Sequence, residues 1–145
     1  MAAYVAKEEI EHYCPKCGKV TKHKYVGTVY DKVEYECTEC YNKIKLPFEE
    51  VKREAVTGLE RLSAKVEEAF RREWRQMPLV DKAWQVLKDH GSAFDVKQRI
   101  ISRLVEYLDI SEAEAEKCFE ELMKRGKIRY IGGGLYECRI YAPKK

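Results

Sequence analysis

The sequence predicts an α+β protein in which two small folded regions are joined by a long helix. Two C-x-x-C pairs lie near the N-terminus in a stretch rich in Val, Tyr and Thr, which is typical of short antiparallel strands. Apolar residues recur at helical spacing over residues 48–77, and residues 78–145 combine three short helical patterns with a β-hairpin pattern. We therefore expect domains at residues 1–47, 48–77 and 78–145.

The composition describes a soluble globular protein. Hydrophobic residues make up 45% and charged residues 37% of the 145 positions, and the formal net charge is +3. No apolar run approaches the roughly 18 residues of a membrane span, and no signal-like segment opens the chain. We therefore expect a cytoplasmic protein with no membrane partner. Many Glu, Lys and Arg with few Gln and Asn are typical of hyperthermophiles, which suggests an archaeal-like source.

The four N-terminal cysteines are Cys14, Cys17, Cys37 and Cys40, and 19 residues separate the two pairs. This spacing is typical of a four-cysteine zinc site. Four thiolates complete a tetrahedral shell and leave no position for water or substrate, so we expect one structural Zn²⁺ that supplies most of the folding free energy of the first domain. Iron takes the same ligands and stays an alternative, as does a redox dithiol.

The strands around these cysteines follow from β-forming residues between breaks. Three strands are expected, over residues 20–30, 32–36 and 43–46. Residues 1–10 carry no such pattern, and we expect them to be frayed. Gly18 follows Cys17, where the chain needs a left-handed residue. Tyr41 occupies the matching place in the second pair, so we expect Asn42 to take the left-handed conformation there.

The segment Cys14-Pro15-Lys16-Cys17-Gly18, with the second C-x-x-C pair, resembles the zinc-ribbon family. In that family two such turns lie at the tips of facing β-hairpins. The C-P-K-C-G motif is typical of ribbons in archaeal transcription factors and in some large-subunit ribosomal proteins. The resemblance covers about a third of the chain, and it implies a metal and a role in binding DNA, RNA or protein.

Residues 48–77 are expected to form one long helix that begins after Pro47. Its apolar positions are Phe48, Val51, Ala55, Leu59, Leu62, Val66, Phe70 and Met77. Several of them are 11 residues apart, a spacing that keeps a stripe nearly straight along a helix. A single apolar stripe needs a partner. We expect either the same helix of a second chain, which gives a homodimer, or the C-terminal domain.

Residues 78–145 show helix start and stop signals. Helices are expected over residues 79–90, 95–108 and 111–125, and strands over 127–131 and 135–141. Asp95 with Gln98, and Ser111 with Glu114, have the spacing of capping boxes. Cys118 and Cys138 are most simply small buried residues, and a disulfide between them is the alternative.

Three helices followed by a hairpin, with the segments 104–111 and 118–128, resemble the winged helix-turn-helix family. The resemblance covers residues 78–141. Most members of that family bind DNA, and a minority bind RNA or protein only. However, residues 111–125 contain five acids and three bases. Such a helix is repelled by phosphates unless its glutamates turn away.

Basic residues provide the candidate nucleic-acid contacts. They are Lys16, Lys19, Lys22 and Lys24 in the first domain, and Lys97, Arg99, Arg103, Lys117, Arg129 and Arg139 in the last. Lysines contact phosphates without reading sequence. The four N-terminal lysines are equally well explained as compensation for the negative charge of a metal held by four thiolates.

No catalytic constellation stands out, since His12, His23 and His90 lie apart, with no nucleophile–base spacing or phosphate-binding loop around them. We therefore expect a non-enzyme. The first hypothesis is a zinc-binding transcription regulator that binds nucleic acid, DNA before RNA, and acts as a dimer. The second is an adaptor that docks on RNA polymerase or the ribosome through protein or RNA contacts.

Overall fold

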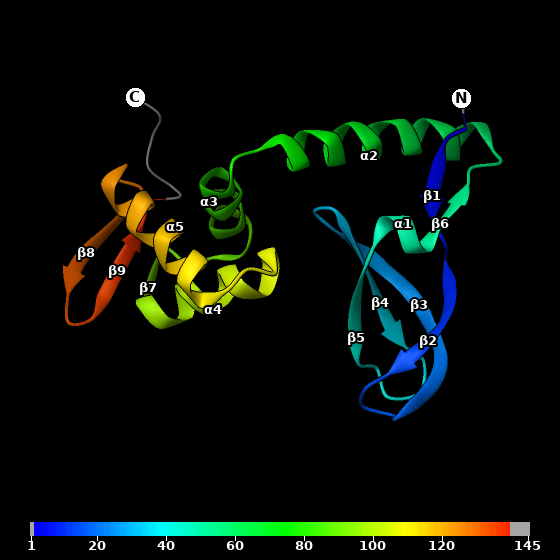
Figure 1. Cartoon of the computed structure of the whole chain (residues 1–145), viewed down its shortest axis with the longest axis horizontal. Coiled ribbons are helices and arrows are strands. Elements are labelled where there is room, and N and C mark those ends of the chain that lie inside the picture. The colour runs from blue at the N-terminus through cyan, green and yellow to red at the C-terminus, as the bar shows by residue number, and fades with distance from the viewer. Residues whose placement is uncertain (1, 140–145) are drawn as a thin grey trace. The chain divides into compact units, whose positions relative to one another are not determined.

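The computed structural model describes residues 2–139 and confirms the α+β class. It divides the chain into two compact units, Met1–Gln76 and Met77–Lys145. Residues 48–76 therefore belong with the cysteine-containing region. Figure 1 shows the elements of each unit. Among the described residues, none of the helices has the length and apolar character needed to cross a bilayer.

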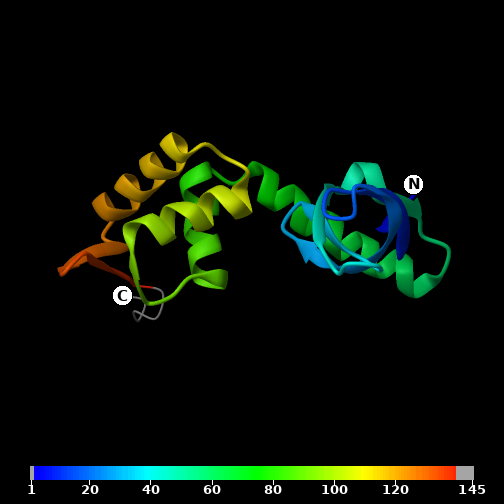
Figure 2. The ribbon, with the colours of Figure 1, turned by 90° about the horizontal axis from the view of Figure 1, so that it is seen from below.

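The first unit is built on a four-stranded antiparallel sheet in the order β2-β3-β4-β5. Its elements are β1 (Tyr4–Ala6), β2 (Glu9–Cys14), β3 (Lys19–Val29), β4 (Lys32–Cys37), β5 (Lys43–Pro47), α1 (Phe48–Val51), β6 (Lys52–Glu54) and α2 (Gly58–Gln76). Figure 2 shows the strands almost end-on, curled around a common interior. The three strands expected from the sequence correspond to β3, β4 and β5.

The expectation of a frayed start is wrong. Residues 4–6 form β1, which pairs with β6 so that Val5 lies opposite Arg53. Residues 9–14 form β2, which pairs with β3 along its whole length. β1 finds its backbone partner about 48 residues along the chain, whereas β2 pairs with the strand that follows it. Pairing therefore orders short segments that have no strong local pattern.

The single long helix over residues 48–77 is also wrong. The helix stops after Val51, because residues 52–54 pair with β1 as β6. A new helix begins at Gly58, and the Thr57 hydroxyl accepts a hydrogen bond of 3.0 Å from the Glu60 amide. Thr57 and Glu60 have the spacing of a capping box, a local start signal that the 11-residue periodicity obscured.

The core of the first unit contains Val33, Tyr35, Phe48 and Val51. The Tyr35 hydroxyl donates a hydrogen bond of 2.7 Å to the Lys7 carbonyl, which ties the segment between β1 and β2 to β4. Helix α2 packs on the rest of the unit through Ala64, Arg71 and Trp74, and Trp74 stacks on Tyr30 with ring centroids 4.0 Å apart. Its apolar stripe stays exposed, from Leu59 and Leu62 to Val66 and Phe70.

The second unit combines three helices with a three-stranded antiparallel sheet in the order β7-β9-β8. Its elements are α3 (Leu79–His90), β7 (Phe94–Val96), α4 (Lys97–Leu108), α5 (Glu112–Lys124), β8 (Ile128–Gly132) and β9 (Leu135–Cys138). The largest fully buried side chains are Leu87, Ile100, Leu104, Phe119 and Leu122. The final part of the expected strand 135–141 lies outside the described residues.

The two capping boxes differ in outcome. At α5 the box is present, with the Ser111 hydroxyl accepting from the Glu114 amide. At α4 it is not: Val96 precedes the helix without a side-chain cap. The buried Asp95 carboxylate instead accepts from the Val96 amide at 2.8 Å and pairs with Arg103 at 3.2 Å. Residues 94–96 form a strand, so the carboxylate points into the unit rather than back over the helix start.

Candidate metal centre

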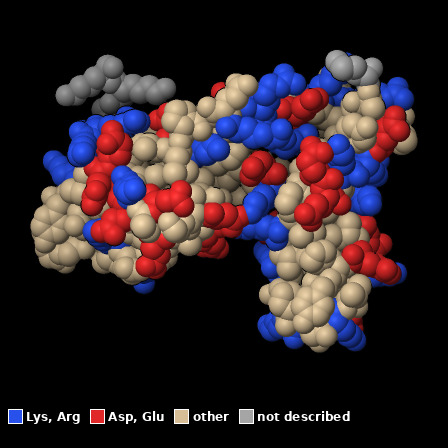
Figure 3. All heavy atoms as spheres, in the orientation of Figure 1, with Lys and Arg blue, Asp and Glu red and all other residues tan. Residues whose placement is uncertain are grey.

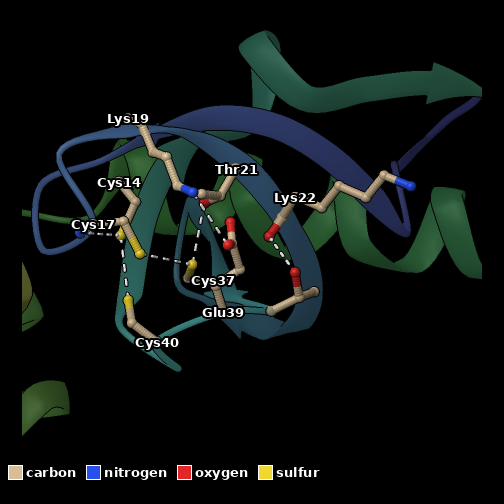
Figure 4. A network of polar contacts seen from close by, with 9 residues as sticks. Cys14, Cys17, Lys19, Thr21, Lys22, Cys37, Glu39 and Cys40 are labelled. Carbon is tan, nitrogen blue, oxygen red and sulfur yellow. Dashed lines mark hydrogen bonds and ion pairs between the residues drawn. The ribbon is translucent and has the colours of Figure 1, made fainter.

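The four cysteines converge at one end of the β2-β3-β4-β5 sheet (Figure 4). Cys14 ends β2 and Cys37 ends β4, and a tight turn after each strand places Cys17 and Cys40. The amide of Gly18 donates to the Cys14 carbonyl at 2.8 Å, and the amide of Tyr41 donates to the Cys37 carbonyl at 3.0 Å. The two turns are therefore built in the same way.

The residue that takes the left-handed conformation in the second turn is Tyr41, with φ 63°, and not Asn42. It matches Gly18 in the first turn, with φ 72°. The expectation for Asn42 is therefore wrong by one residue. The turn geometry around sulfur outweighs the steric cost of about 1–2 kcal/mol that a side chain meets in this region.

The sulfur atoms have the spacing of a tetrahedral metal shell. Cys14 Sγ lies 3.4 Å from Cys40 Sγ, and Cys17 Sγ lies 3.8 Å from Cys37 Sγ. All four lie within 4.8 Å of one another. A zinc–sulfur bond of about 2.3 Å places tetrahedral ligands about 3.8 Å apart. The residues present therefore fit a single ion held by four thiolates, and within the described part of the chain this is the one cluster of its kind.

Thr21 contacts the cysteine cluster and was not among the residues predicted from the sequence. It is buried on β3, and its hydroxyl lies 3.1 Å from Cys37 Sγ. This hydrogen bond lowers the pKa of Cys37 to about 6, with further help from the backbone amides of Cys40 and Glu39. Metal ions bind thiolate, so a group that stabilises thiolate prepares the site for the ion. The sequence feature that could have identified Thr21 is its spacing of two residues from His23, since alternate residues of a strand lie on the same face and both are buried on β3.

A shell of four thiolates leaves no open position, so the arrangement suits a structural role. His23 is buried beside the cluster, and its Nδ1 hydrogen bonds to the Thr21 carbonyl at 3.0 Å. His12 lies edge-on to the His23 ring, with centroids 6.1 Å apart. His23 lies opposite Cys37 across the β3–β4 pair, so its ring belongs to the packed interior next to the cysteine cluster.

The four N-terminal lysines are exposed, but acids lie near most of them. Glu11 lies directly across the strand pair from Lys22, and Glu9 from Lys24. Lys19 forms an ion pair of 3.4 Å with Glu39, as Figure 4 shows. The lysine-rich stretch therefore forms a surface of mixed charge, because β2 places glutamates opposite two of its lysines.

The six predicted contacts in the second unit fall into two groups. Three of them are engaged within the unit: Lys97 with Glu116 at 2.9 Å, Arg103 with Asp95 at 3.2 Å and Arg129 with Glu137 at 3.0 Å. The other three, Arg99, Lys117 and Arg139, are exposed. Lys117 lies on α5, whereas Arg99 lies on α4.

Cys118 and Cys138 are buried and carry free thiols. Burial raises the pKa of Cys118 and raises that of Cys138 to about 11. Both thiols are therefore protonated at neutral pH and unreactive, as expected for small core residues.

Comparison with protein-family models, curated proteins and solved structures finds no match for this chain. The case for function therefore comes from the residues and their geometry.

Proposed function

We propose that the chain is a non-enzymatic, zinc-stabilised protein that binds nucleic acid, duplex DNA in preference to RNA, in the manner of a transcription regulator. The observation that supports this most directly is the charge that α5 presents to solvent. Three of its glutamates have partners within the unit: Glu114 in the cap, Glu116 with Lys97 and Glu121 with Arg125.

The remaining charges on α5 balance. Glu112 and Glu120 are exposed acids, and Lys117 and Lys124 are exposed bases. The buried residues of α5, such as Ala115 and Leu122, define its inner side, and helical spacing puts Lys117 and Lys124 on the side opposite to them. The solvent-facing side of α5 is therefore less acidic than the count of five acids and three bases suggests.

The arrangement of the second unit supports a winged helix-turn-helix. Helices α4 and α5 follow each other across a turn at residues 109–111, and the hairpin β8–β9 comes directly afterwards. Asp109 ends α4 with a left-handed φ of 52°. In this reading α5 enters the major groove, and the hairpin forms the wing.

The metal in this proposal is Zn²⁺. Four cysteine ligands in two knuckles are the donor set of structural zinc sites, and zinc adds no redox chemistry. Elemental analysis of the purified protein should find about one zinc per chain. Iron in equal amount would instead identify a rubredoxin-like centre.

Salt-dependent binding to a labelled duplex tests the nucleic-acid proposal. Replacing Lys117 by Glu should weaken binding for all duplex sequences and lower the salt slope by about 1 or more, because phosphate contacts release counterions. Lys88→Glu on α3 makes the same charge change at another exposed helical site and should leave the slope unchanged. An unmodified protein that binds no duplex at low salt would refute the proposal.

The second candidate is an adaptor that docks on RNA polymerase or the ribosome. It is favoured by apolar side chains exposed on β7, β8 and β9, namely Phe94, Val96, Ile131 and Leu135. Val96 and Leu135 are direct cross-strand neighbours, so part of this set is one continuous patch. Salt-insensitive binding to purified polymerase or ribosomes that Leu135→Ser abolishes, together with no duplex binding, would favour this candidate.

We also propose that the protein acts as a homodimer through the exposed stripe of α2, which is shorter than the stripe expected over residues 48–77. Leu59, the most exposed of its large apolar side chains, is 79% accessible. Burying such a stripe against a second copy would remove it from water.

A further inference from the structure

A pocket of about 240 Å³ in the first unit lies between the elements β1, α1, β6 and α2, and no part of it belongs to the metal centre. Four cations line it: Lys52 on β6, and Arg71, Arg72 and Arg75 on α2. Two carboxylates, Glu49 and Glu68, line it as well, so the lining carries a net charge of +2. Glu49 pairs with Lys52 at 2.7 Å and Glu68 pairs with Arg72 at 3.3 Å, so neither carboxylate is paired with Arg71 or Arg75. None of these cations is among the nucleic-acid contacts predicted from the sequence.

Arg71 is the most informative of them because it is buried, with only 4% of its surface accessible. Its guanidinium lies 3.6 Å from the centroid of the Phe48 ring. Its ion pair with Glu67 is long, at 3.8 Å, and within the described residues it has no closer acidic partner. A guanidinium has five N–H donors, and a buried one normally has several of them occupied.

The charges around Arg71 are mixed. Burial lowers its pKa from the ordinary arginine value and the Arg75 guanidinium lowers it further, whereas the carboxylates of Glu67, Glu68 and Glu49 act in the opposite direction. Arg75 itself forms no ion pair with any described residue, and it still lines the pocket. Arg71 and Arg75 are one helical turn apart on α2, and an anion bound between them would offset the repulsion between the two guanidinium groups.

Helical spacing explains how one helix supplies this side of the pocket. Arg71, Arg72 and Arg75 lie within about one turn of each other on α2, and Ala64 lies two turns earlier on the same side. Ala64 is buried and carries only a methyl group, so it leaves space where a larger side chain would fill the pocket. Figure 3 shows lysine and arginine side chains gathered along α2 with carboxylates between them.

We propose that this pocket binds a phosphate group between Arg71 and Arg75, with the ion-paired Arg72 and Lys52 beside it. Guanidinium groups match the oxygen geometry of phosphate and bind it with two parallel hydrogen bonds. A water molecule takes about 30 Å³ of liquid volume, so the pocket has room for a phosphate or pyrophosphate group with a few waters. Phe48 and Tyr4 give it a partly apolar wall, which strengthens charge interactions inside.

The phosphate comes from a small phosphate compound or from the end of a nucleic-acid strand, and both offer the same oxyanion. The inference does not depend on the proposed function, because none of the residues involved belongs to the second unit. A protein that fails to bind duplex DNA through Lys117 would still bind phosphate here.

Calorimetric titration of the zinc-loaded full chain with inorganic pyrophosphate at low salt tests the site. The double variant R72Q/R75Q should bind at least about tenfold more weakly, because it removes two cations and their charge-assisted hydrogen bonds from the pocket. The control R61Q/K65Q removes the same charge from exposed positions of the same helix outside the pocket and should bind like the unmodified protein. Circular dichroism should show that both variants stay folded.

Two outcomes would overturn the inference: no binding of pyrophosphate by the unmodified protein in the millimolar range, or an equal loss in both double variants. Competition with an oligonucleotide identifies the source of the group. A strand that displaces pyrophosphate only when it carries a 5′-phosphate points to a nucleic-acid end. Failure of either strand to compete points to a small phosphate compound, and both results support the pocket.

Discussion

Replacing Thr21 by valine removes one hydroxyl from the neighbourhood of the metal and keeps the shape of the side chain nearly unchanged. That hydroxyl lies 3.1 Å from Cys37 Sγ and is buried, so no water takes its place without rearrangement. A hydrogen bond to a charged group contributes about 1.5–3 kcal/mol. We therefore expect T21V to bind zinc about tenfold to a hundredfold more weakly than the unmodified protein.

Competition with a chromophoric zinc chelator at fixed pH measures this difference. Thr38 provides the matched control, because it lies next to Cys37 and its hydroxyl donates at 3.1 Å to the Lys22 carbonyl rather than to sulfur. T38V should therefore keep the zinc affinity of the unmodified protein. If T21V binds zinc within about twofold of the unmodified protein, or if T38V loses as much, then the hydroxyl does not stabilise the bound ion.

Three further results are expected. Cys14→Ser should abolish metal binding and unfold the first unit, since structural zinc contributes roughly 10–16 kcal/mol in small domains. Calorimetry should still show a separate unfolding transition of the second unit. A single joint transition would contradict separate folding of the two units. Leu62→Asp with Val66→Asp should convert a dimer into monomers in sedimentation velocity, and an unmodified protein that is already monomeric would exclude dimerisation through α2. Asp95→Ala should destabilise the second unit by about 2–4 kcal/mol in urea unfolding, because it leaves the half-buried Arg103 guanidinium without its carboxylate partner. A loss under about 0.5 kcal/mol would show that solvent already hydrogen bonds to the Arg103 guanidinium.

The clustering of the four cysteines and the central strands could be predicted from the sequence because their signals are local. Two C-x-x-C pairs specify their own turns, and runs of Val, Tyr and Thr between breaks specify β3 and β4. The Ser111 capping box is likewise contained within four residues and forms as expected. Features of this kind need no knowledge of distant partners.

The wrong predictions concern segments whose structure depends on contacts with distant parts of the chain. Strands β1 and β6 have three residues each and are about 48 residues apart, so neither has a pattern that local reasoning detects. The 11-residue spacing linked Phe48 and Ala55 to α2, although both lie before that helix begins: Phe48 is buried in α1, and Ala55 is buried in the loop after β6. Apolar spacing alone does not show whether a stretch is one helix or several pieces that share a core.

The surface charge of β3 and α5 was predicted wrongly for a related reason. Lysines at 22 and 24 have no acid near them in sequence, yet β2 brings Glu11 and Glu9 opposite them. On α5 the reverse holds, since acids that dominate the count are paired within the unit. Thr21 escaped notice because its importance depends on a sulfur 16 residues away.

The sulfur cluster also constrains how the sheet is assembled. Cys14 and Cys37 end two strands that flank β3, and in a strand every second side chain points to the same side. If either outer strand slid by one residue, its cysteine would face away and the ion would lose a ligand. Binding of the ion therefore stabilises only the correct register of the strands, because only that register completes the four-cysteine shell.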